Sequence, residues 1–96
     1  MHVISFKRIK EFIQKHPDSE ASLRDWYRIV KRGNYNSFNE LKLHFSSADY
    51  VDGYVVFNIS GNKYRMITAI HFNRKKVYIR EILTHSEYNK NKWKKQ

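Results

Sequence analysis

The chain has 96 residues, which is enough for one domain around one hydrophobic core and too few for two, so we expect a single domain over residues 1–96. It has no cysteine, which excludes disulfides and thiolate chemistry, and its 41% hydrophobic and 16% aromatic residues exclude a disordered chain. A formal net charge of +10, from 19 Lys and Arg against 9 Asp and Glu, predicts an anionic partner, with nucleic acid first and a merely soluble basic protein as the alternative.

Membrane association is not expected from the sequence. No apolar run is long enough to span a bilayer, and the opening MHVISFKRIK lacks the apolar core of a signal peptide. The basic residues are spread over predicted helices, turns and tail instead of along one amphipathic face. We therefore expect a cytoplasmic protein that binds no membrane.

Two helices are predicted in the first third of the chain. Pro17 ends the first, Asp18 or Ser19 caps the second, and the second ends before Gly33. Each helix carries an apolar stripe that needs a surface to cover. The stripes are Phe6, Ile9, Phe12 and Ile13 in the first helix and Leu23, Trp26, Tyr27 and Val30 in the second.

The segment SFNELKLHF, residues 37–45, has a mixed pattern. Ser37 and Glu40 have the spacing of a helix capping box, whereas Leu41, Leu43 and Phe45 alternate as in a strand. We expect a short helical turn that runs into a strand.

Three runs rich in β-branched and aromatic residues follow, at residues 54–59, 64–72 and 77–83, separated by SGNK and NRKK. They predict two successive hairpins. The fold class is therefore α+β, with two N-terminal helices packed on one face of a small antiparallel sheet.

The expected turns set the register of the sheet. A turn centred on residues 61 and 62 places Asn58 opposite Arg65. A turn centred on residues 74 and 75 places Arg80 opposite Ala69 and Thr84 opposite Arg65. Both arginines then project from the face that the helices leave open, where they form a cradle for phosphate.

The same register divides the strand residues between two faces. It places the carboxylate of Glu81 on the apolar face, which is unfavourable and indicates that one of the turns is longer than assumed. A one-residue slip would separate the two arginines. The expected core face carries Val55, Phe57, Ile59, Tyr64, Met66, Thr68, Ile70, Phe72, Val77, Ile79 and Leu83, and the other face Asn58, Arg65, Ile67, Ala69, Tyr78, Arg80, Ile82 and Thr84.

A short C-terminal helix is expected after the last strand, because Thr84 and Glu87 have capping-box spacing. His85 and Tyr88, three residues apart, would lie on one side of that helix. They would then converge with the two arginines.

At this point the sequence resembles a known family. FNISGNKYRMITAIHF followed by VYIREILTHSEY is similar to the C-terminal half of HigB-type toxins, mRNA interferases of the RelE-like superfamily in bacterial toxin–antitoxin pairs. The opening MHVIS, the helical pair, and the G-N-x-x-R, I-R-E and T-H-x-E-Y signatures are similar as well. The resemblance thus extends over nearly the whole chain.

The resemblance implies a RelE-like toxin that enters the ribosomal A site and cuts mRNA there without a metal or other cofactor. The ribose 2′-OH would attack the adjacent phosphate and leave a cyclic phosphate and a 5′-OH. It also implies contact with rRNA and a HigA-type helix-turn-helix antitoxin as partner. Operator DNA would be bound only through the toxin–antitoxin complex.

This reaction needs positive charge at the phosphorane and groups that transfer protons. Arg65 and Arg80 are the candidates for transition-state stabilisation, because a guanidinium matches two phosphate oxygens. His85 is the candidate acid or base. Tyr88 is expected to orient the nucleophile, stack on a base or transfer a proton. Candidates for RNA binding are Lys63, Lys42, Asn58, Lys92, Lys94 and Lys95.

Each assignment has a structural alternative. His85 is then an exposed residue at a helix start, Arg65 and Arg80 pair with Glu81 or Glu87, and Tyr88 packs against the sheet edge. The terminal NKNKWKKQ is either a solvated charged end or a segment that grips rRNA, with its tryptophan stacked on a base. No two histidines are four residues apart on one helix, so a metal site is not expected.

Two other functions fit the same composition. A non-catalytic RNA- or ribosome-binding module would inhibit translation by occupancy and leave mRNA uncut. A basic protein with only a protein partner would bind that partner without the steep salt dependence of phosphate contacts.

Overall fold

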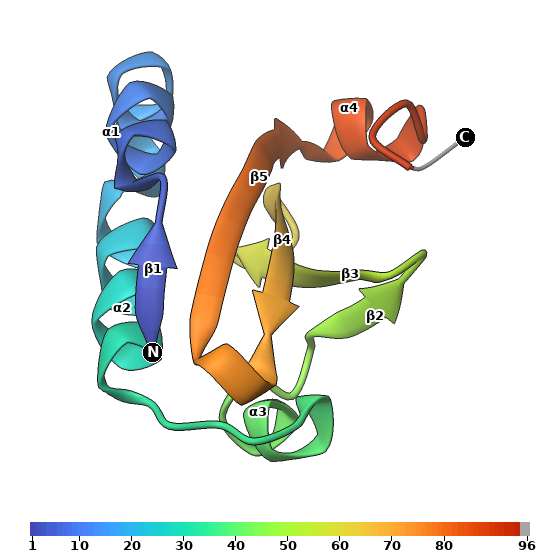
Figure 1. The fold of residues 1–96 in the computed structure, drawn as a ribbon. Helices are drawn as coiled ribbons and strands as arrows, with labels where there is room; N and C mark the ends of the chain where they lie inside the picture. Colours follow the sequence, from blue (N-terminus) through green and yellow to red (C-terminus); the bar gives the residue numbers. More distant parts are fainter. Residues whose placement is uncertain (95–96) are drawn as a thin grey trace.

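The structure is a computed structural model that describes residues 1–94. It confirms the α+β class. Helices α1 and α2 lie together beside one face of the sheet, whereas α4 follows the end of β5 (Figure 1). In chain order the elements are β1 (His2–Ile4), α1 (Phe6–Lys15), the 3₁₀ turn η1 (Pro17–Ser19), α2 (Glu20–Arg32), α3 (Phe38–His44), β2 (Asp49–Val51), β3 (Tyr54–Ile59), β4 (Tyr64–His71), the 3₁₀ turn η2 (Phe72–Arg74), β5 (Lys76–Thr84) and α4 (His85–Asn89).

The described strands form a mixed sheet in the order β1-β5-β4-β3-β2. Strand β1 runs parallel to β5, so the expectation of a purely antiparallel sheet is wrong. The helices between β1 and β2 return the chain across the sheet, which permits this parallel pairing. A strand of three residues with one buried side chain, Val3, is too short to show strand periodicity in the sequence.

Helices α1 and α2 place their predicted stripes against the sheet, with Ile9, Leu23, Trp26 and Val30 buried. The capping of α2 differs from the prediction. Ser19 stands at the N-cap position, but its hydroxyl donates to the carbonyl of His16 (2.6 Å) instead of accepting a helix amide.

Helix α3 covers most of the segment that was expected to continue as a strand, and that expectation is wrong. Ser37 Oγ accepts the Glu40 amide (3.2 Å), while the Glu40 carboxylate accepts the Asn36 amide (2.9 Å). Leu41 is fully buried, whereas Leu43 is 83% exposed. Helical spacing, not alternation, therefore decides which leucine packs inward.

The first hairpin has the predicted register, with Asn58 opposite Arg65. Its loop spans residues 60–63, and Ser60 and Gly61 adopt left-handed backbone angles (φ 54° and 68°). Glycine adopts this conformation without steric cost, which makes the turn readable from sequence.

The second hairpin differs from the prediction. Its loop takes in residues 72–75, and Lys75 is left-handed (φ 57°), so Tyr78, not Arg80, lies opposite Ala69. A β-bulge between Ile67 and Thr68 leaves Arg80 as an extra residue in β5. Beyond it, the register is shifted by one residue.

The bulge exchanges the faces assigned to the end of β5. Glu81 now lies opposite Ile67 and Leu83 opposite Arg65, on the face away from the helices, while Ile82 packs into the helix-covered core. The expected positions of Glu81, Ile82, Leu83 and Thr84 are therefore wrong. The extra residue keeps the Glu81 carboxylate out of the apolar interior, where it would lose its hydration.

Both faces of the sheet carry hydrophobic cores. The larger core lies between the sheet and the helices and includes Ile9, Leu23, Trp26, Phe57 and Met66. The second lies on the opposite face, where the C-terminal segment folds back. It contains Tyr54, Val56, Ile67 and Trp93, with Val51, Ala69, Leu83 and Tyr88 packed against them.

In residues 1–94 no helix has the length and apolar character needed to cross a bilayer.

Candidate active site on the arginine face

Arg65 and Arg80 lie on the sheet face opposite the helix pair, which we call the arginine face. Each guanidinium lies over a tyrosine ring: Arg65 Cζ is 5.4 Å from the ring centroid of Tyr88, and Arg80 Cζ is 5.4 Å from that of Tyr54. Trp93 stacks on Tyr88, with centroids 4.9 Å apart and planes at 15°, and lies 6.4 Å from the Tyr54 centroid. The three rings form an aromatic row with one arginine at each end.

The two arginines are not neutralised within the described chain. Among residues 1–94 no carboxylate comes within ion-pair distance of Arg65 or Arg80, so the pairing with Glu81 or Glu87 considered above is not seen. Arg65 is instead held by neutral acceptors, since Nη1 donates to the carbonyls of Asn62 (2.9 Å) and Tyr64 (3.3 Å). The site therefore presents two oriented cations to an anionic ligand.

Helix α4 begins with the predicted capping box. Thr84 Oγ1 accepts the Glu87 amide (3.2 Å), and the Glu87 carboxylate accepts the Thr84 amide (2.9 Å). The hydrogen bond from that amide lowers the pKa of Glu87, although partial burial acts in the other direction. The His85 amide donates to the Lys63 carbonyl (3.1 Å), which ties α4 to the first hairpin.

Tyr88 is half-buried against the second core. Burial raises its pKa, the Arg65 guanidinium acts against this rise, and the Asp49 carboxylate adds to it. The phenol therefore keeps its proton at neutral pH and acts as a hydrogen-bond donor.

His85 differs from the other three candidates because it is not packed. Its side chain is exposed, and across residues 1–94 its ring makes no hydrogen bond or ion pair. The structure thus brings together Arg65, Arg80 and Tyr88 through the aromatic row and leaves His85 facing solvent at the start of α4.

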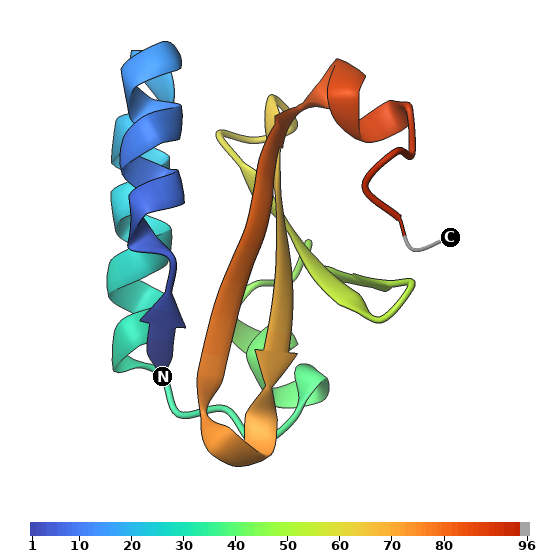
Figure 2. The same cartoon turned by 45° about the horizontal axis from the view of Figure 1, so that its top comes forward.

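The predicted RNA-binding residues divide into two groups. Asn58, beside Arg65, and Lys92 and Lys94, in the segment after α4, lie on or next to the arginine face. Lys42 lies on α3, at the opposite end of the sheet from α4 (Figures 1 and 2), and the ammonium of Lys63 is paired with Asp18. Lys95 lies outside the described residues.

Next to Arg80 the surface forms a cleft of about 630 Å³. Its lining includes side chains from four parts of the chain: Arg8 of α1, Tyr54 of β3, Tyr78 and Glu81 of β5, and Trp93 of the segment after α4. Of these, only Trp93 was considered as an RNA-contacting residue from the sequence. In the described part of the chain, no three His, Asp or Glu side chains are grouped so that they could hold a metal ion.

Comparison with known proteins identifies the family. Residues 19–91 match the sequence profile of the HigB toxin family, described as the RelE-like toxic component of a toxin–antitoxin system. The chain belongs to the HigB toxin family. It is 35% identical over 92 residues to the mRNA interferase toxin HigB of Escherichia coli K12, covering 93% of this chain and 88% of that protein. The mRNA interferase HigB of E. coli O6:H1 (strain CFT073) is 30% identical over 93 residues, covering 94% of this chain and 90% of that protein.

The HigB family match includes the four candidate catalytic residues and leaves out part of the cleft. Arg65, Arg80, His85 and Tyr88 fall inside residues 19–91, whereas Arg8 and Trp93 fall outside. The sequence did not indicate Arg8 as a site residue. Arg8 lies near Arg80 because Ile4, just before α1, pairs with Tyr78, and this pairing was not predicted. For Glu81, the sequence did carry a signal: the predicted register placed its carboxylate on the apolar face, which indicated that the true register differs.

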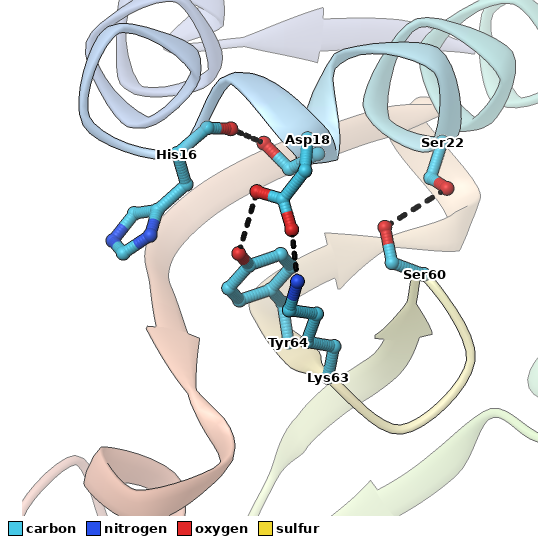
Figure 3. A network of polar contacts seen from close by, with 7 residues as sticks. His16, Asp18, Ser22, Ser60, Lys63 and Tyr64 are labelled. Carbon is cyan, nitrogen blue, oxygen red and sulfur yellow. Dashed lines mark hydrogen bonds and ion pairs between the residues drawn. The ribbon is translucent and has the colours of Figure 1, made fainter.

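A polar network ties the first hairpin of this HigB-family chain to its helices (Figure 3). The Asp18 carboxylate accepts hydrogen bonds from the Lys63 ammonium and the Tyr64 hydroxyl (2.8 Å for the latter), and Ser60 Oγ donates to Ser22 Oγ (3.0 Å). The Lys63 ammonium, followed by the Tyr64 hydroxyl, holds the pKa of Asp18 below its usual value. Because Arg65 follows Tyr64, this network also sets the position of the arginine.

We expect Asp18→Asn to lower the free energy of unfolding modestly near neutral pH. Since the pKa of Asp18 is lower in the folded than in the unfolded chain, its contribution is present above the unfolded value, about 3.9, and is lost as pH falls through the folded value. The difference in urea midpoint between the variant and the wild type should therefore be largest near pH 7 and become smaller as the pH is lowered below about 3.9. A difference that persists in acid would show that hydrogen-bond geometry, not charge, is responsible.

Proposed function

We propose that this HigB-family toxin is a ribosome-dependent endoribonuclease that cleaves translated mRNA in the cytoplasm. The observation that carries the proposal is the pair of arginines, without carboxylate partners in residues 1–94, held at the two ends of one aromatic row. The relatives named mRNA interferase support the same substrate.

The reaction proposed is an internal transfer at one phosphate of the RNA. The ribose 2′-oxygen forms a bond to phosphorus while the bond to the 5′-oxygen breaks, which leaves a 2′,3′-cyclic phosphate and a 5′-OH. Negative charge rises on the non-bridging oxygens in the transition state. Arg65 and Arg80 would stabilise that charge with their planar donor forks, and Arg65 is already oriented by the hairpin carbonyls.

Two proton transfers accompany this step, and we assign them to α4. The exposed imidazole of His85 would take the proton of the 2′-OH. Tyr88, whose raised pKa keeps it protonated, would supply a proton to the leaving 5′-oxygen. The capping box fixes the start of α4 and so keeps the two side chains one turn apart.

The partners proposed follow from the family and from charge. The formal net charge of +10 favours contact with rRNA in the A site. As the toxic component of a toxin–antitoxin system, the protein would be neutralised by a HigA-type helix-turn-helix antitoxin, and operator DNA would be bound through their complex.

Mapping of mRNA 5′ ends after brief induction tests the proposal. We expect new 5′-OH ends within reading frames when the wild-type protein is made, and none with the Arg65→Ala/Arg80→Ala variant at equal abundance. Translation arrest without new ends would favour the occupancy model. Undiminished cutting by the double variant would remove the two arginines from the mechanism.

A further inference from the structure

The cleft beside Arg80 collects cations from separate parts of the chain. Arg8 comes from α1, Arg80 from the bulge in β5, and Lys92 from the segment after α4. All three side chains are exposed. Two features bring these three cations together: the pairing of Ile4 with Tyr78, and the packing of the C-terminal segment back onto the sheet.

The charge of this cleft is only partly balanced. One carboxylate, Glu81, lines it against the three cations. Within residues 1–94, none of the ion pairs involves Arg8, Arg80 or Lys92. By contrast, Arg24 and Arg28 on α2 are each paired with an acidic neighbour one turn away. The cleft thus holds three cations that have no ion-pair partner within residues 1–94.

The cleft is also lined by a half-buried aromatic ring. Tyr78 sits on its wall and is held edge-on by His71, with ring centroids 5.3 Å apart. A basic groove with aromatic side chains suits single-stranded nucleic acid, whose phosphates bind the cations while its bases contact the rings. A free inorganic anion would make no use of the ring.

We infer that this cleft is a second phosphate subsite, in which Arg8 and Lys92 hold the RNA phosphate next to the scissile one. The inference rests on the proposed function, because Arg80 is shared: it faces the scissile phosphate from the aromatic row and forms the near wall of the cleft. Arg8 and Lys92 are binding residues here, so they set the affinity for RNA and take no part in bond making.

The test measures binding, not cleavage. The probe is a short single-stranded RNA with 2′-O-methyl riboses, which has no free 2′-OH to attack the phosphate. We expect Arg8→Ala/Lys92→Ala to bind it about tenfold or more weakly and to lower the slope of log affinity against log salt by about 0.7, the value for one phosphate that is no longer neutralised on a single strand. Thermal unfolding of the variant should match the wild type, because both side chains are exposed.

A chemical replacement locates the phosphate. Each phosphate of the probe is changed in turn to a neutral methylphosphonate. At one position the change should weaken binding to the wild-type protein and leave binding to the double variant unaltered. The matched control is Lys10→Ala/Lys31→Ala. It removes two exposed helix cations, which lie over the rings of Phe6 and Tyr27, and this variant should bind the probe like the wild type.

Three outcomes would overturn the inference. They are unchanged binding by Arg8→Ala/Lys92→Ala, an equal loss with the lysine control, and no binding of the probe by the wild type at low salt. Each of them leaves the nuclease proposal standing if induced mRNA is still cut, because that proposal is tested through Arg65 and Arg80.

Discussion

Arg80→Ala is expected to lower the rate of cleavage of ribosome-bound mRNA by about 10² or more, the usual effect of losing one preorganised transition-state donor. The side chain is exposed and lies on the Tyr54 ring, so its removal leaves no buried group unpaired. The protein should therefore stay folded. Single-turnover cleavage of a programmed ribosome complex, with the variant in excess, measures this rate.

Arg80→Lys separates charge from geometry. It keeps the positive charge but loses the planar fork, so we expect it to recover only a small part of the rate. Arg28→Ala is the control, since it removes an exposed arginine that is paired with Asp25 on α2. Cleavage by Arg80→Ala within about twofold of the wild-type rate, or an equal loss with Arg28→Ala, would rule out a role at the reacting phosphate.

Trp93→Ala is expected to lower the free energy of unfolding by about 3 kcal/mol, because it removes a large side chain that is only 8% exposed. The loss should extend to activity. Tyr88 and Tyr54 both pack against Trp93, and each supports one arginine. Urea unfolding gives the stability, and cleavage at a temperature where the variant is folded gives the effect on the site.

Trp93→Phe provides the graded control. It keeps an aromatic ring in the row but removes the hydrogen bond from Nε1 to the Tyr88 carbonyl (2.9 Å), so a loss of about 1 kcal/mol is expected. If Trp93→Ala and the wild type unfold at the same urea concentration, the packing of the C-terminal segment does not stabilise the sheet.

The sequence predicted correctly those parts of the fold that are determined by residues close together in the chain. The apolar stripes of α1 and α2 and the left-handed turn at Gly61 are encoded within a few residues of each other, and with them the pairing of Asn58 with Arg65. The capping box at Thr84 is local in the same sense. These features could be read from the sequence because no distant part of the chain decides them.

The bulge at Arg80 could not be placed from the sequence. Alternation with period two does not show where a strand carries one extra residue, so residues beyond Arg80 were assigned to the wrong faces. The predicted position of the Glu81 carboxylate on an apolar face indicated that the register was wrong near this residue. Arg80 shares a face with Arg65 because it lies two residues after Tyr78, which pairs with Ala69; the bulge changes only the faces of the residues that follow Arg80.

The second core was also missed, although the sequence carried a sign of it. Tyr54, Val55, Val56 and Phe57 are apolar without interruption, which is typical of a strand buried on both faces. Trp93 lies among lysines, so nothing in its neighbourhood indicated burial. Its position depends on a contact with β3 that spans almost forty residues of sequence.

The pairing of β1 with β5 has a consequence for synthesis on the ribosome. The first strand of the nascent chain has no partner until residues 76–78 have been made, and the helix pair has no complete sheet to cover before then. The aromatic row closes later still, when Trp93 arrives. Such sequence-distant pairing delays folding, so the cations that would bind RNA come together only after the segment that carries Trp93 has been made, and an antitoxin already present can meet the toxin as this face forms.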